Sequence, residues 1–137
     1  MELKYAKKLF ELDNIVFIVL TKSLTDEERI FLNKYNIKYF GDEIDNGDNS
    51  FEDTIGIMKN IDGVISTDTS LVHLSNNLGI KTYTLLTRGC EWRWTQDKYT
   101  KWYPDNILVR QNERGNWNSV IDKLIEYLKD EELLSII

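Results

Sequence analysis

The chain has 137 residues, a net charge of −6 and one cysteine, and this composition excludes several classes of protein. At roughly 100 to 200 residues per domain, the length predicts a single domain over residues 1–137. Hydrophobic residues make up 42% and charged residues 29% of the chain, which is typical of a globular protein and excludes a disordered or fibrous one. The acidic balance argues against binding to nucleic acid, because phosphate neutralisation needs a clustered basic surface.

The single cysteine, Cys90, and the single histidine, His73, leave no cluster for a structural zinc, so we expect no metal and no cofactor. One cysteine also excludes an internal disulfide and favours a reducing compartment. No apolar run approaches the ~18 residues needed to cross a bilayer, and the charged start MELKYAKKLFELD lacks a signal-peptide core. We therefore expect a cytoplasmic protein with no membrane span.

Short β-branched runs alternate with amphipathic helical stretches along the chain. This pattern predicts an α/β fold, a mostly parallel, Rossmann-like sheet of about five strands with helices on both faces. A first helix is expected over residues 2–12, and a strand at 15–20 is apolar throughout, as in strands covered on both faces. Thr25 and Glu28 form a capping box that opens a helix to about residue 34, and a short strand follows at 37–40.

The second half of the chain continues the alternation. The acidic stretch 41–50 (GDEIDNGDNS) is predicted to be a loop with a solvated surface, after which Ser50 and Asp53 cap a helix. The next elements are a strand at 63–67, a helix at 70–78 ended by Gly79, and strands at 81–86 and 107–110. The final helix is expected from apolar residues that repeat at spacings of three and one: Trp117, Val120, Ile121, Leu124, Ile125 and Leu128.

A connection of about 19 residues, 87–105, joins the last two predicted strands. Connections of this length inside a small domain are usually functional or disordered. This one carries the sequence's only proline and five large aromatic residues, which argues against disorder. These residues are Trp92, Trp94, Tyr99, Trp102, Tyr103 and Pro104.

Residues that could bind a phosphate group follow the third predicted strand. Asp68, Thr69 and Ser70 stand where that strand turns into a helix, so free backbone N–H groups and the positive helix end face the edge where α/β sheets bind ligands. His73 lies about one turn into the helix, and its side chain tilts back toward the helix start. The alternative is that Asp68 or Thr69 only caps the helix and His73 is a packing residue.

Further candidates lie in neighbouring loops. Arg88 and Arg93 offer positive charge for a diphosphate, and Trp92 and Trp94 offer flat rings for a base or sugar. The alternation of residues 92–94 equally allows both indoles to enter the core with Arg93 outside. Lys22, after the first predicted strand, is either a ligand contact or an ordinary surface lysine.

Residues 51–86, FEDTIGIMKNIDGVISTDTSLVHLSNNLGIKTYTLL, resemble the segment of family 9 glycosyltransferases (the ADP-heptose heptosyltransferase type) built around an Asp-Thr-Gly, His and Ala-Leu-Gly pattern. They resemble still more closely the glycosyltransferase-like domain that ends many bacterial tetratricopeptide-repeat proteins. Further elements of that domain follow in the same order: Trp92-Arg93-Trp94, Trp102-Tyr103-Pro104, LVRQ at 108–111 and NWNSV at 116–120. The resemblance runs from about the first strand to the last helix.

The resemblance implies the nucleotide-sugar-binding, C-terminal half of a two-domain glycosyltransferase of the GT-B type. Thr69, Ser70 and His73 would then contact the donor diphosphate, Asp68 would fix the loop, and Lys22 would lie near the ribose. The implied chemistry is metal-free and inverting, with the helix end and nearby cations stabilising the leaving diphosphate. The nucleotide sugar would be a substrate, so no cofactor is implied.

This sequence departs from the family pattern in three places. Ser70 replaces a glycine, and Thr87, Arg88 and Gly89 replace a proline-bearing turn, which makes Arg88 new to the sugar-facing edge. The acceptor domain, which supplies the expected general base, has no counterpart here. We therefore expect the chain to act with a partner chain or domain that supplies the acceptor half, and not to be a complete transferase alone.

Two other functions fit parts of this sequence. A non-catalytic interaction or assembly module would keep the fold and use Trp92, Trp94 and Trp102 to contact a protein partner or another copy of the chain. A phosphoacceptor receiver domain fits the length, but Thr21, Lys22 and Ser23 stand where its acidic pair is needed to bind magnesium. The receiver function is therefore disfavoured.

Overall fold

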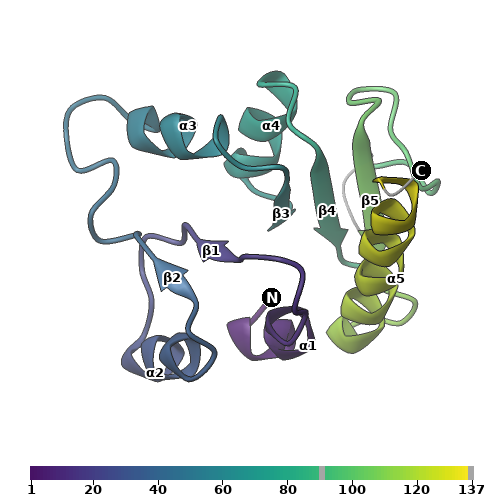
Figure 1. Cartoon of the computed structure of the whole chain (residues 1–137). Coiled ribbons are helices and arrows are strands. Elements are labelled where there is room, and N and C mark those ends of the chain that lie inside the picture. Colours follow the sequence, from purple (N-terminus) through teal and green to yellow (C-terminus); the bar gives the residue numbers. More distant parts are fainter. Residues whose placement is uncertain (90–91, 136–137) are drawn as a thin grey trace. The chain divides into compact units, whose positions relative to one another are not determined.

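The computed structural model describes residues 1–89 and 92–135, so Cys90 lies outside the described residues. The chain forms two compact units, Met1–Ile57 and Met58–Ile137, whose placement relative to each other is not determined, so each is described by itself (Figure 1). The predicted α/β class and parallel pairing are confirmed, but the strands form sheets of two (β1-β2) and three (β3-β4-β5) where the sequence predicts one sheet of about five. Within 1–89 and 92–135, no helix combines the length and apolarity needed to cross a membrane.

The first unit contains short elements. In chain order they are the 3-10 helix η1 (Leu3–Ala6), α1 (Lys7–Phe10), β1 (Ile18–Val19), α2 (Asp26–Lys34), β2 (Lys38–Tyr39) and, at its end, α3 (Glu52–Met58). The strand predicted at 15–20 is reduced to two half-buried residues, and Val16 is 85% exposed. Among the described residues β1 pairs with β2 alone, and both of its residues are half-buried, so the prediction of a strand covered on both faces is wrong.

The second helix is formed as the sequence predicts. The Thr25 hydroxyl accepts a hydrogen bond from the Glu28 backbone N–H (3.2 Å), and the Glu28 carboxylate accepts one from the Thr25 N–H (3.0 Å). At the other end, Asn36 adopts a positive φ of 54°, and the Ile37 N–H returns to the Leu32 carbonyl, which closes the helix. The unit also contains a cluster of aromatic rings, formed by Phe10, Phe17, Phe31 and Tyr35.

The loop at 41–50 caps α3 and is more than a solvated surface. Asp45 Oδ1 accepts hydrogen bonds from the N–H groups of Asp53 (2.9 Å) and Thr54 (3.4 Å), and the other oxygen accepts from the Thr54 hydroxyl. In return, the Asp53 carboxylate accepts from the Asp45 N–H (2.8 Å). The predicted pairing of Ser50 with Asp53 is therefore wrong, because a carboxylate eight residues away takes the capping position.

Asp45 makes the stability of the first unit depend on pH. Burial raises the pKa of Asp45, but the hydrogen bonds from Thr54 and Asp53 outweigh burial and lower the pKa below its ordinary value. The stability it contributes is therefore complete above its unfolded pKa of about 3.9 and is lost as the pH falls through the lower, folded pKa. Asp45→Ala should cost about 1 kcal/mol at pH 7 and flatten the acid limb of urea unfolding curves. Asp48→Ala in the same loop, at an exposed position, is the control; equal losses from both would contradict the capping role.

The second unit is a parallel sheet between two helices (Figure 1). Its elements are β3 (Val64–Thr67), α4 (Ser70–Asn77), β4 (Thr82–Leu86), β5 (Asn106–Arg110) and α5 (Trp117–Ser135). β4 lies in the centre and is buried at all five positions. α4 ends as predicted: Gly79 has a φ of 70°, and the Ile80 N–H donates to the Ser75 carbonyl (3.0 Å).

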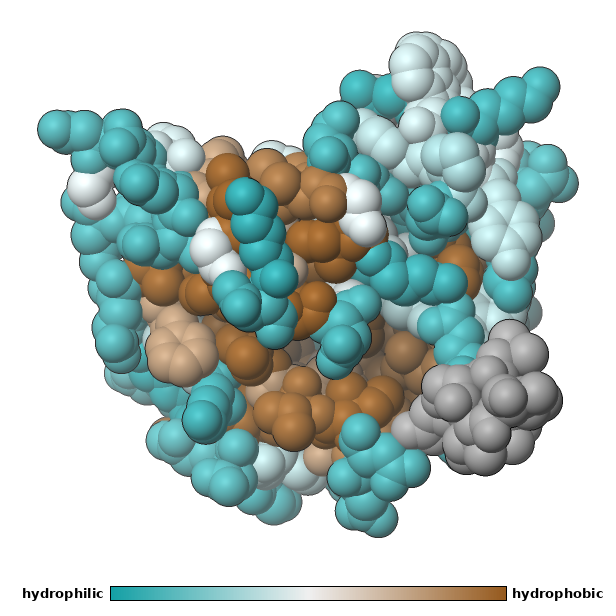
Figure 2. All heavy atoms as spheres, turned by 45° about the horizontal axis from the view of Figure 1, so that its top comes forward, coloured by the Kyte–Doolittle hydropathy of each residue, from teal (hydrophilic) through white to brown (hydrophobic). Residues whose placement is uncertain are grey.

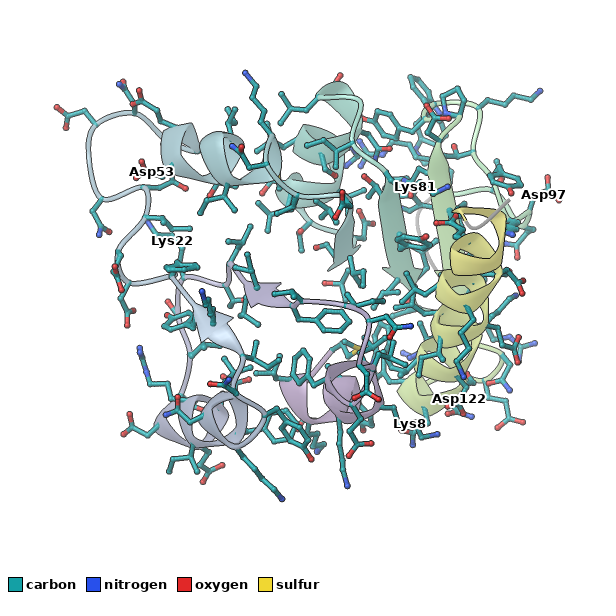
Figure 3. The ribbon with its side chains drawn as sticks, in the orientation of Figure 1. Lys8, Lys22, Asp53, Lys81, Asp97 and Asp122 are labelled. Atoms are coloured by element: carbon teal, nitrogen blue, oxygen red, sulfur yellow. The ribbon has the colours of Figure 1, made fainter. Side chains whose placement is uncertain are left out.

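The two faces of this sheet bury different side chains. On the α4 face, Ser75 Oγ and Thr82 Oγ1 are hydrogen-bonded (2.9 Å), beside an apolar cluster of Val72, Leu86, Trp94 and Leu108. On the α5 face, the buried Tyr83 hydroxyl donates to Glu131, whose carboxylate also pairs with Lys81 (2.7 Å). Figure 3 shows Lys81 beside α5. Burial, and then the hydrogen bond to Glu131, raise the pKa of Tyr83 above its ordinary range.

Candidate functional site

The loops that follow the three parallel strands of the second unit all begin at the same edge of its sheet, the one formed by the carboxyl ends of the strands. β3, β4 and β5 end at Thr67, Leu86 and Arg110, which stand in adjacent register. The loops at 68–69, 87–89 and 111–116 therefore begin at the same edge, where α/β sheets bind ligands. Seven of the eight predicted site residues belong to the second unit; Lys22 belongs to the first.

The N-terminus of α4 is exposed and has no side-chain cap. Thr69, at the N-cap, has extended backbone (φ −139°, ψ 172°), and its side chain makes no cap hydrogen bond; its hydroxyl lies 3.1 Å from Ser66 Oγ. Asp68, Thr69 and Ser70 are all exposed. Among the described residues Asp68 has no hydrogen bond or ion pair, so the loop-fixing role implied for it is not seen. The Val72 N–H donates to the Thr69 carbonyl (3.1 Å), so the first-turn N–H groups that make no hydrogen bond to a described residue, and are open to an anion, are those of Ser70 and Leu71.

His73 is held in place from two sides. Its Nδ1 lies 2.9 Å from the Tyr103 hydroxyl, and its ring stacks on Trp94 with centroids 5.5 Å apart and an interplanar angle of 22°. The prediction that His73 is a packing residue is therefore confirmed for one face and one nitrogen of the ring. The other nitrogen, Nε2, makes no hydrogen bond within the described part of the chain. The ring is therefore oriented by its neighbours, and Nε2 is left to bond to a ligand.

The two indoles of the 92–94 segment have opposite environments. Trp94 is 2% exposed and belongs to the core, whereas Trp92 is 76% exposed and contacts Trp102 edge to face, with centroids 6.0 Å apart. The prediction that both indoles enter the core is wrong, and so is the prediction that Trp94 stacks on a ligand. The segment forms a turn and not a strand, so the expected alternation of sides does not apply.

The arginines and Lys22 each have a defined local environment. Arg88 is exposed, and its Nη1 donates to the Asn112 carbonyl (3.2 Å), which ties the loop after β4 to the loop after β5. Arg93 is half-buried, and its carbonyl accepts a hydrogen bond from Thr100 Oγ1 (3.1 Å). In the first unit, Lys22 Nζ donates to the Asp45 carbonyl (2.7 Å). Figure 3 labels Lys22 near Asp53, beside the loop that joins β2 to α3.

The long connection is ordered in its described part, residues 87–89 and 92–105. The Leu108 N–H donates to the Lys98 carbonyl (2.8 Å), and Tyr99 forms an antiparallel bridge with Ile107, so the connection covers the outer edge of β5. Arg110 Nη2 donates to the Trp94 carbonyl (3.2 Å). These contacts place Trp94 and Tyr103 against α4.

Some residues of this edge were not singled out by the sequence. Tyr103, which orients His73, stands in the sequence only as one of the aromatic residues of the long connection, since its partner lies 30 positions away. A hollow of about 770 Å³ lies beside Arg88 in the second unit. Its described lining residues are Thr87, Arg88, Gly89, Gln111, Arg114, Gly115 and Trp117. The only signal for Gln111 was its place in the segment LVRQ.

Comparisons with known proteins do not identify a family for this chain. It matches no family model, and neither the curated proteins nor the solved structures give a significant match. The resemblance to family 9 glycosyltransferases therefore rests on the sequence segments quoted above and stays a prediction.

Proposed function

We propose that the second unit binds the diphosphate of a nucleoside diphosphate sugar at the N-terminus of α4. The observation that carries this proposal is the exposed, uncapped start of α4 next to an imidazole oriented by Tyr103 and Trp94. Backbone N–H groups and the helix dipole favour a bound anion at such an end. The hydroxyls of Thr69 and Ser70 add donors at the same place.

The Tyr103 contact favours one role for His73. When the Tyr103 hydroxyl donates to Nδ1, the neutral ring carries its proton on Nε2, and this N–H can donate to a phosphate oxygen. A protonated ring would present the same N–H. The imidazole would therefore stabilise negative charge on a leaving diphosphate, and no metal ion is needed for that step.

On this proposal the chain is the donor-binding half of a family 9-type, GT-B glycosyltransferase. The two parallel sheets would correspond to parts of one Rossmann-like sheet in that half. Lys22, Arg88, Trp92 and Arg93 remain proposed contacts of the nucleotide or sugar. The acceptor half, with its general base, would come from a partner chain or a further domain.

Substitution of Ser70 tests the proposed site directly. Ser70→Trp places an indole over the first-turn N–H groups, so the affinity for the nucleotide that binds most tightly among ADP, UDP and GDP should fall at least about tenfold. Ser70→Ala keeps every backbone donor and should change the affinity by no more than about threefold. Calorimetric titration gives both values, and an amide spectrum checks that each variant is folded. Equal affinities in wild type and Ser70→Trp would overturn the proposal.

A second function, a non-catalytic interaction module, is favoured by one surface. Trp92 and Trp102 are 76% and 60% exposed, and Tyr99 is 51% exposed. Figure 2 shows pale, ring-bearing side chains gathered at the upper right of the view. Exposed aromatic side chains are common anchors of protein interfaces. Self-association that is lost in Trp102→Ala and is indifferent to nucleotide would support this function.

A further inference from the structure

The hollow in the second unit is built by the loops that follow β4 and β5. Thr87, Arg88 and Gly89 come from the first loop, and Gln111, Arg114 and Gly115 come from the second, with Trp117 at the start of α5. The hydrogen bond from Arg88 to the Asn112 carbonyl joins the two loops. A volume of about 770 Å³ lies within the ~300–1,000 Å³ range of small-molecule sites.

The described lining residues of this hollow carry a net positive charge. Arg88 and Arg114 are its only ionisable side chains among the described lining residues. Both are exposed, and Arg114 makes no ion pair or hydrogen bond with any residue whose side chain is described. Guanidinium groups match the geometry of phosphate and carboxylate oxygens, so the lining favours a ligand that carries one of these groups.

Gln111 provides a buried hydrogen-bond donor in the same lining. The side chain is 3% exposed, and its Oε1 accepts a hydrogen bond from the Gly115 N–H (3.1 Å). This bond fixes which end of the amide is the NH₂ group. Within the described residues Nε2 has no hydrogen-bond partner, although buried donors are almost always paired. Because Nε2 is itself buried, a small shift of the Gln111 side chain would let an acceptor oxygen on a ligand satisfy it.

We propose that this hollow is a binding site for a small molecule that carries a phosphate or carboxylate group. Arg88 and Arg114 bind the anionic oxygens, Gln111 Nε2 donates to an acceptor on the ligand, and the half-buried Trp117 offers an indole for the rest of the molecule. The site shares Arg88 with the proposed contacts of the nucleotide or sugar, but it is separate from the N-terminus of α4 and can be tested without it. Its residues come from different loops and include no residue of α4.

The test uses the full chain, labelled with ¹⁵N and held at constant ionic strength with sodium chloride. Inorganic phosphate is titrated in one arm and sodium acetate in the other, which separates the two anion chemistries. We expect saturable shifts of the Gln111 side-chain NH₂, the Arg114 Nε–H and the Trp117 indole N–H in at least one arm. Shifts that rise linearly with concentration, or that spread evenly over the surface, would overturn the proposal.

Variants separate this site from other cationic surfaces. Arg114→Gln should raise the dissociation constant of the anion that binds about fivefold or more, because it removes a charged hydrogen-bond donor. Arg114 is exposed, so the substitution should leave the fold intact. Lys129→Gln, on an exposed part of α5 outside the hollow, removes the same charge and should leave the constant unchanged. Ser70→Trp should also leave it unchanged. A constant equal in wild type and Arg114→Gln, or equally raised in Lys129→Gln, would contradict a built site.

Discussion

Replacing Trp94 with alanine is expected to lower the free energy of unfolding of the second unit by about 3–5 kcal/mol. The indole is 2% exposed and packs in the cluster with Val72, Leu86 and Leu108. Its removal takes away buried apolar surface and leaves a cavity beside these three side chains. Urea unfolding followed by far-ultraviolet circular dichroism measures the change.

Trp92→Ala is the matched control, because the same residue type two positions away is 76% exposed. It should change the unfolding free energy by no more than about 0.5 kcal/mol. The comparison also concerns the site, since Trp94 supplies the surface on which His73 stacks. Similar losses in the two variants would mean that Trp94 is not a core residue.

Replacing Gly41 with alanine should destabilise the first unit by about 1–3 kcal/mol. A Cβ at this position would lie 2.0 Å from the Thr21 carbonyl oxygen and 2.6 Å from the Tyr39 ring. Both distances are far below van der Waals contact, and the nearer atom belongs to the backbone, so the loops after β1 and β2 would have to move apart. Thermal unfolding of the first unit is the measurement.

Gly47→Ala provides the control for Gly41, because no atom lies within 4 Å of a Cβ built there. Reduced backbone freedom in the unfolded chain should make this variant neutral or slightly more stable. If Gly41→Ala were as stable as Gly47→Ala, the close approach of the Thr21 backbone would be contradicted.

Features set by neighbouring residues could be predicted from the sequence. The Thr25–Glu28 capping box and the Gly79 helix end depend on groups only a few positions apart, and both are formed. The apolar spacing of the last helix is equally local: Val120, Ile121 and Leu124 are at most 1% exposed. Local hydrogen bonding and helical periodicity leave few alternatives, which explains these successes.

Features that depend on distant partners could not be predicted in the same way. Asp45 caps α3 from eight residues away, and Tyr103 reaches His73 across 30 positions. Apolar content alone did not show that β1 would be only two residues long, because strand length depends on which neighbour it pairs with. The start of α4 was predicted as a site from its loop, but the orientation of His73 depends on a connection whose path the sequence does not specify.

One titration tests most directly whether the exposed start of α4 binds a nucleotide diphosphate. ADP, UDP and GDP, each with a matching nucleotide sugar, are added to the ¹⁵N-labelled full chain while amide and imidazole resonances are followed. We expect saturable shifts centred on Thr69, Ser70 and the His73 ring for at least one nucleotide. Spectra that remain unchanged at these residues with every nucleotide at millimolar concentration would contradict the claim.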